Sequence, residues 1–231
     1  KGYHNPVTTA DKAADSFLKH TLMKGRPEYG WLSEETVDSF ERLNKRKVWI
    51  VDPLDGTTNF AHRYPFFCIS IALEVDGELE LGVVYDPMAM DLFSAQKHNG
   101  AHLNGKQISV SPERALSESL LSTGFPTDHQ NILGNLRLFQ DFMLASRAVR
   151  RNGSAALDLC YVAAGRLDGF WELSLHPWDV AAGALIVQEA GGTVSRFDGS
   201  FLQLRIPEIV ASNEGIHDQM LHTIKNHLAN P

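Results

Sequence analysis

The chain has 231 residues and 43% of them are hydrophobic, which allows one large domain or two lobes that share a core. The formal net charge is −7 and no basic run appears, so nucleic acid is excluded as the principal partner. The two cysteines lack the spacing of a zinc site or a disulfide framework, as expected of a protein in the reducing cytoplasm. No apolar run approaches transmembrane length, so no membrane partner is expected.

A helix is predicted over residues 8–24. Thr8 is a candidate N-cap with Asp11 three residues further on, an arrangement related to the capping box. Asp11 falls in the first turn, where its plain structural role is to complement the helix dipole. Because the chain begins at Lys1 without Met and enters this region at once, we expect a segment to precede it.

Two strands are predicted next. A short strand over residues 30–35 ends in two acids, the first of which is Glu34. Residues 48–51 are apolar and mostly β-branched, which is typical of a buried strand. Pro53 has no N–H to donate to a sheet, so we expect the second strand to stop at Asp52.

The stretch after this strand carries two carboxylates three residues apart. Asp52 and Asp55 would repel each other at the end of a buried strand unless a hard divalent cation neutralised them. Gly56 allows close backbone approach to a ligand, and the N–H groups of Gly56, Thr57 and Thr58 could face an anion at the start of a helix. The alternative is an ordinary capped turn, because Asp-Pro and Asp-Gly are common turn pairs.

The middle of the chain is predicted to be a scaffold of antiparallel strands. Asp76-Gly77 and Asn104-Gly105 are hairpin turn pairs. An amphipathic helix is expected over residues 132–145. Strands are expected over residues 67–75, 79–85, 90–95, 100–103 and 120–123.

From residue 150 the pattern is a turn, a helix of small residues and a strand. The N–H groups of Gly153, Ser154 and Ala155 could face a polar ligand at the helix N-terminus. The alternative is that Ser154 only caps this helix. Glu172 ends the strand, and the alternative for it is an ordinary surface acid.

Residues 175–192 predict a buried helix. Pro177 suits its first turn, the following residues are apolar nearly all round, and Gly191-Gly192 ends it. Asp179 would then lie in the first turn, where a buried acid is costly unless it is paired, liganded or used as a cap. Strands over 193–197 and 209–212 and a helix over 217–228 complete the chain.

Several of these stretches resemble the inositol monophosphatase family. The stretch D-P-L-D-G-T-T-N-F from Asp52 resembles the family's signature motif, and W-D-V-A-A-G with E-A-G-G resembles its second motif. N-P-V-T-T-A-D resembles the opening motif, with Asn5 where many members have Asp, and Ser33 replaces the Gly of the usual G-E-E. The resemblance covers almost the whole chain. It implies a layered αβαβα sandwich of the α/β class and sugar-phosphatase type, with an α+β lobe over residues 1–145 and an α/β lobe over residues 146–231.

The resemblance also implies a site that holds Mg²⁺, with two or three ions. Its metal ligands would be Glu34, Asp52, the Leu54 carbonyl, Asp55 and Asp179. Asp11 and Thr57 would orient a water for in-line attack, and Gly56 and Thr57 would hold the phosphate through their N–H groups. The substrate's hydroxyl groups would contact Asp55, Gly153, Ser154, Ala155, Glu172 and Asp179.

The function that the resemblance implies is Mg²⁺-dependent hydrolysis of myo-inositol monophosphate by a metal-activated water. Thr58-Asn59-Phe60 resembles the inositol branch, because relatives that act on other phosphates often carry Arg with Ala or Ser after the D-G-T. Fructose 1,6-bisphosphate and other sugar or polyol phosphates stay open as substrates. So does a regulatory binding protein that kept the fold, or a simple cation-binding protein. A cytoplasmic homodimer and inhibition by lithium are further expectations of the family.

Overall fold

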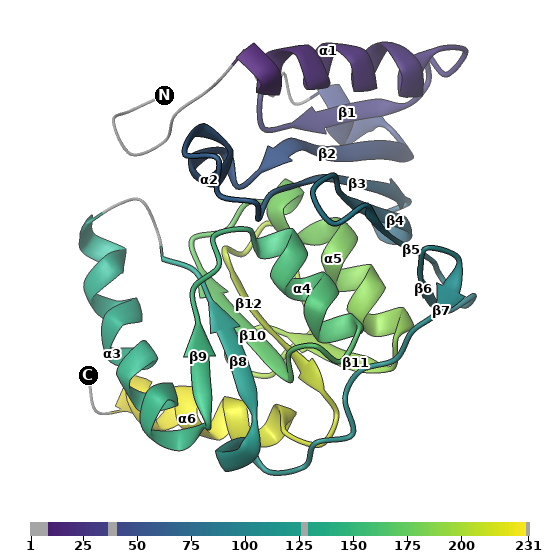
Figure 1. Ribbon diagram of the computed structural model, residues 1–231. Helices are drawn as coiled ribbons and strands as arrows, with labels where there is room; N and C mark the ends of the chain where they lie inside the picture. The colour runs from purple at the N-terminus through teal and green to yellow at the C-terminus, as the bar shows by residue number, and fades with distance from the viewer. Residues whose placement is uncertain (1–8, 37–40, 126–128, 230–231) are drawn as a thin grey trace.

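The structure, a computed structural model, describes residues 9–36, 41–125 and 129–229. Five layers follow one another through the molecule (Figure 1). Helix α1 (Thr9–Met23) covers a seven-stranded sheet, and α4 (Ala155–Ala163) and α5 (Pro177–Glu189) lie between this sheet and a five-stranded one. Helices α3 (His129–Ala145) and α6 (His217–Ala229) cover the far face of the second sheet. This order confirms the predicted αβαβα sandwich.

The seven strands of the first sheet stand in the order of the sequence. The β1–β2 pair is parallel and is linked through a 3-10 turn over Glu41–Asn44, while the other neighbours are antiparallel. Asp76 and Gly77 have φ values of 53° and 87°, as the predicted two-residue hairpin requires. The strands are β1 (Gly30–Ser33), β2 (Lys47–Asp55), β3 (Cys68–Val75), β4 (Glu78–Asp86), β5 (Asp91–Gln96), β6 (Ala101–Leu103) and β7 (Lys106–Gln107).

The predicted end of the strand at Asp52 is wrong, because β2 continues to Asp55. The pairing of β2 with β3 shifts between Asp52, opposite Ser70, and Asp55, opposite Cys68. The three-residue step on β2 thus faces a two-residue step on β3, which is a β-bulge. Pro53 lies inside this bulge, where no N–H is needed for the ladder.

The second sheet has the order β11-β12-β10-β8-β9, with β8 parallel to both of its neighbours and β12 antiparallel to both of its own. The sequence did not indicate β9. The lobe boundary at residue 145 stays a prediction, and β8 lies ahead of it in the chain. The strands are β8 (Leu120–Thr123), β9 (Ala148–Arg150), β10 (Gly169–Leu173), β11 (Gly192–Ser195) and β12 (Glu208–Asn213).

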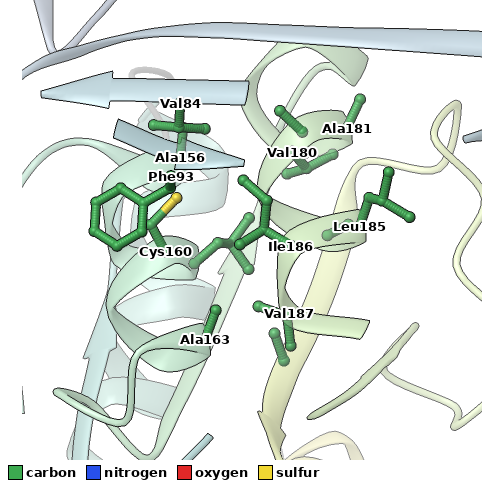
Figure 2. Close-up of a cluster of buried hydrophobic side chains, with 14 of the residues drawn as sticks. Val84, Phe93, Ala156, Cys160, Ala163, Val180, Ala181, Leu185, Ile186 and Val187 are labelled. Atoms are coloured by element: carbon green, nitrogen blue, oxygen red, sulfur yellow. The ribbon is translucent and has the colours of Figure 1, made fainter. Parts of the chain in front are cut away.

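The core between the two sheets is built on α4 and α5, whose buried side chains interlock with those of the first sheet (Figure 2). Small residues let the layers approach closely. A Cβ at Gly183 would lie 2.6 Å from the Cβ of Leu159, and one at Gly82 would lie 2.8 Å from the carbonyl oxygen of Ala182. Helix α5 is therefore enclosed, as its apolar composition predicted. None of the helices in the described ranges is long and apolar enough to cross a membrane.

Candidate active site

One cavity of about 220 Å³ brings together predicted site residues from six parts of the chain. They come from the ends of β1, β2 and β10 and from the starts of the short helix α2 (Thr57–Ala61), α4 and α5. The cavity lining includes Glu34, Asp52, Leu54, Asp55, Gly56, Thr57, Gly153, Ser154, Ala155, Glu172 and Asp179.

Asp11 lies beneath this lining and reaches it through Thr57. The Thr57 Oγ1 hydroxyl lies 3.1 Å from Asp11 Oδ1 and 3.0 Å from the Leu54 carbonyl oxygen. Its single hydrogen can serve only one of these acceptors fully at a time. Asp11 is 1% exposed, on the face of α1 that packs against β2. The hydroxyl of Thr57 therefore connects a buried carboxylate to the cavity.

Asp52 is a buried carboxyl group surrounded by other acids of the cavity. Burial raises its pKa well above the usual range, and the charges of Asp55, Glu34 and Asp179 raise it further. The Leu54 N–H, 2.9 Å from Oδ1, acts in the opposite direction. Negative charge from four points on the chain thus converges on one buried group.

Asp55 is held by the start of α4. Its Oδ2 accepts hydrogen bonds from Ser154 Oγ at 2.7 Å and from the Ala156 N–H at 2.8 Å. Burial raises the pKa of Asp55 to about 6, with these two hydrogen bonds opposing the rise. Ser154 also accepts from the Leu157 N–H at 3.3 Å, so it caps the helix as well as contacting the acid. The two interpretations of Ser154 are compatible.

Asp179 combines a cap with a place in the cavity. Its Oδ2 accepts from the His176 N–H at 2.7 Å, across the first turn of α5, where Pro177 holds the first position. The same side chain lines the cavity, and its charge raises the pKa of Asp52 and of Glu172. The capping role therefore does not account for Asp179 by itself.

The sequence interpretation missed Arg151 and Asp158, which also line the cavity. Burial raises the pKa of Asp158 to about 8, although its Oδ1 accepts from Asn152 Nδ2 at 2.6 Å. Burial and nearby acids raise the pKa of Glu172 well above its usual range, and Arg151 opposes both shifts. Both missed residues lie within a few positions of the G-S-A element, and this proximity is the only feature of the sequence that could have indicated a place in the cavity.

The donor chemistry fits a hard divalent cation. The predicted ligands are carboxylates and one backbone carbonyl, all of them hard oxygen donors, and burial together with the neighbouring acids raises the pKa of Asp52. Among the described residues, no group of three Asp, Glu, His or Cys side chains is already closed around one point. The assignment of individual ligands therefore stays a prediction.

Asn59 joins two walls of the cavity. Its Nδ2 donates to the Phe66 carbonyl at 2.7 Å and to the Asn152 carbonyl at 2.9 Å. The side chain thereby ties the short helix after the carboxylate motif to the turn that leads into Gly153. No local sequence signal assigns this role, because its partners lie 7 and 93 residues away.

The layered fold is the sugar-phosphatase type that the resemblance implied, and the cavity gathers the residues predicted for its site. The model of the inositol monophosphatase family matches residues 1–229. The chain is 44% identical to the Nus factor SuhB of Escherichia coli K12 and 43% identical to the inositol-1-monophosphatase of Mesorhizobium japonicum, each over 99% of this chain and 86% of the relative. A crystal structure of the suppressor protein SuhB from Bartonella henselae superimposes with a TM-score of 0.91 at 41% identity, covering 97% of this chain and 86% of that one. The chain belongs to the inositol monophosphatase family and is a phosphatase.

Proposed function

We propose that the protein is a Mg²⁺-dependent phosphomonoesterase that hydrolyses myo-inositol monophosphate. The observation that carries the proposal is a cavity whose lining brings together the four predicted acidic ligands, Gly56 and Thr57 at the start of α2, and Glu172. A related structure from Staphylococcus aureus, 32% identical with a TM-score of 0.84, holds bound inositol monophosphate. This supports the substrate class.

In this mechanism two or three Mg²⁺ ions would be held by the predicted ligands, which are Glu34, Asp52, the Leu54 carbonyl, Asp55 and Asp179. When bound, the ions would supply positive charge at the phosphate, lower the pKa of the attacking water and stabilise the leaving alkoxide. Thr57 and Asp11 orient that water, and Asp11 receives its proton through the Thr57 hydroxyl. The N–H groups of Gly56 and Thr57 hold the phosphate oxygens, so the phosphoryl group is fixed for in-line attack.

The substrate end of the cavity recognises hydroxyl groups. Asp55 is oriented by Ser154 and the Ala156 N–H, which fixes the start of α4 beside the acid. Glu172 and Asp179 add carboxyl groups that accept hydrogen bonds from a polyol. Another polyol phosphate, such as fructose 1,6-bisphosphate, would meet the same acceptors and is the nearest alternative substrate.

Phosphate release tests the proposal. We expect turnover of inositol 1-phosphate with Mg²⁺, no turnover with a chelator, and lower kcat/KM for fructose 1,6-bisphosphate, histidinol phosphate and 3′-phosphoadenosine 5′-phosphate. Asp55→Asn should abolish the activity, while Asp198→Asn, at an exposed turn, should not change it. A preference for another phosphate would reject the inositol assignment, and Mg²⁺-independent turnover would reject the mechanism.

The Nus factor name of the Escherichia coli relative favours a regulatory binding function as a second candidate. A test is co-purification with the transcription machinery of the host, using wild-type protein and Asp55→Asn. Equal capture by both would separate binding from catalysis. We further propose a cytoplasmic, lithium-inhibited homodimer, which light scattering and assays with Li⁺ would check.

Replacing Asn59 by Ala is expected to lower kcat about 10-fold. The replacement removes the hydrogen bonds of Asn59 to Phe66 and Asn152, which hold the phosphate-binding wall of the cavity against the wall that contacts the hydroxyl groups. KM should rise by less than about threefold, because no predicted substrate contact is removed. Steady-state kinetics on inositol 1-phosphate would measure both constants. Asn99→Ala, at an exposed turn, is the matched control and should keep wild-type kinetics. Unchanged kcat in Asn59→Ala would show that these hydrogen bonds do not position the site.

A further inference from the structure

Gly124 lines the cavity one residue beyond β8, directly beside Glu172 of β10. The two strands are parallel and Trp171 is paired with Thr123, so the next residue of each strand lies on the same face of the sheet. A Cβ at Gly124 would lie 2.1 Å from Glu172 Oε1 and 2.2 Å from Oε2. The carboxyl group of Glu172 thus occupies the place that a side chain at residue 124 would fill.

The alternation of β10 directs Glu172 into the cavity. Phe170 packs with the core on α4 and α5, whereas Trp171 packs on the other face, with its ring 4.1 Å from that of Phe142 on α3. Glu172 shares the face of Phe170 and therefore points towards the starts of α4 and α5. Within the described part of the chain, no side chain or N–H donates a hydrogen bond to its carboxyl group. That group is therefore open to donors of a ligand.

The backbone beside this carboxyl group is anchored. The Gly124 carbonyl accepts a hydrogen bond from Asn135 Nδ2. The Thr123 hydroxyl donates to the Trp171 carbonyl at 2.6 Å, which ties β8 to β10. Asn135 is fully buried on α3, and its Oδ1 accepts from the Trp171 indole N–H at 3.3 Å. Since Asn135 holds both strands, a clash at residue 124 is relieved more easily by the flexible side chain of Glu172 than by the backbone.

We propose that Gly124 is a specificity-determining residue. Because residue 124 has no side chain, the Glu172 carboxyl group can lie against the sheet, and from this position the carboxyl group hydrogen-bonds the hydroxyl groups of a polyol phosphate. The inference rests on the proposed function and names the residue that shapes its substrate end. Gly124 supplies none of the predicted metal ligands and none of the phosphate-binding N–H groups. Its replacement should therefore affect recognition of the polyol and leave phosphoryl transfer intact.

The test compares Gly124→Ala with wild type on inositol 1-phosphate and on 4-nitrophenyl phosphate. The second substrate has no hydroxyl group on its ring, so it cannot donate a hydrogen bond to Glu172. We expect kcat/KM for inositol 1-phosphate to fall about 10-fold or more, mainly through KM, because a hydrogen bond to a charged group is lost. The constants for 4-nitrophenyl phosphate should stay within about twofold. Gly134→Ala is the matched control, because Gly134 is exposed on α3 and no atom lies within 4 Å of the added Cβ. If the ratio of kcat/KM for inositol 1-phosphate to kcat/KM for 4-nitrophenyl phosphate is the same in Gly124→Ala as in wild type, the proposal is overturned.

A double-mutant cycle sharpens the result. In a Glu172→Ala background there is no carboxyl group to displace, so Gly124→Ala should cause no further loss. Equal losses in both backgrounds would overturn the proposal. So would a Gly124→Ala protein that does not fold, because the backbone, and not Glu172, would then be the part that yields.

Failure of the proposed function is distinguishable from failure of this inference. If the wild type turns over no polyol phosphate, the proposed function fails. Crystal structures of wild type and Gly124→Ala then test directly whether Gly124 determines the position of the Glu172 carboxyl group. A Glu172 carboxyl group displaced in the variant would support this role of Gly124. An unmoved carboxyl group would overturn it.

Discussion

Asp52→Asn is expected to abolish phosphate release and, at the same time, to make the metal-free protein more stable. The variant keeps an oxygen that can accept from the Leu54 N–H, so the bulge at the end of β2 is retained. It removes the charge that burial and three neighbouring acids oppose. Loss of a metal ligand should lower kcat by about three orders of magnitude or more. The unfolding midpoint in chelator should rise by about 2–4 °C for each kcal/mol of repulsion relieved.

Activity assays and thermal unfolding, each with Mg²⁺ and with chelator, would measure both effects. Wild type should gain stability when Mg²⁺ is added, whereas Asp52→Asn should gain much less. Asp198→Asn serves as the control, because its carboxylate is exposed and bonds only a neighbouring serine and an arginine in the described structure. A variant that is both inactive and less stable in chelator would mean that Asp52 is a structural acid and not a cation ligand.

The sequence predicted the parts of the fold that depend on local pattern. Helix α5 is apolar all round and proved to be enclosed between the sheets. The Asp76-Gly77 turn adopts the left-handed angles that only a few residues accept readily. Local pattern also placed the acids of the two long motifs at a strand end and in a first turn. Each of these features needs information from no more than about fifteen neighbouring residues. The meeting of these acids in one cavity was implied by the family resemblance and not by local pattern.

The features that the sequence did not predict depend on partners far apart in the chain. Pro53 was taken to end its strand, because a bulge that accommodates proline is visible only from the register with β3. Asn59 was noted only for its resemblance to the inositol branch, because its hydrogen bonds to Phe66 and to the distant Asn152 cannot be seen in the sequence. Gly124 matters through a side chain 48 residues later, and nothing in its own neighbourhood indicates this. Side-chain contacts across layers are the information that local pattern lacks.

The metal-free protein is expected to lose stability as the pH rises from about 4 to about 8. Burial raises the pKa of Asp55 to about 6 and that of Asp158 to about 8. Between the usual carboxyl pKa and these values the folded state binds protons that the unfolded state has released, so each rise in pH favours unfolding. The contribution of each bound proton to the stability of the folded state is full below pH 4 and is lost as the pH rises through the folded-state pKa of that group. A fall in the unfolding midpoint on the order of 20 °C is expected across this range.

Thermal unfolding in chelator at half-unit steps from pH 4.5 to 8.5 would measure this slope, and two changes should divide it into parts. Added Mg²⁺ should flatten the part that belongs to Asp55, because a bound cation favours the ionised carboxyl group and binds only the folded state. Asp158→Asn should reduce the slope above about pH 6, because burial raises the pKa of this acid to about 8. An unfolding midpoint that rises steadily from pH 5 to 8 in chelator would contradict the raised pKa values. It would mean that the acids of the cavity are already compensated by groups of the protein, which removes the electrostatic reason for a cation.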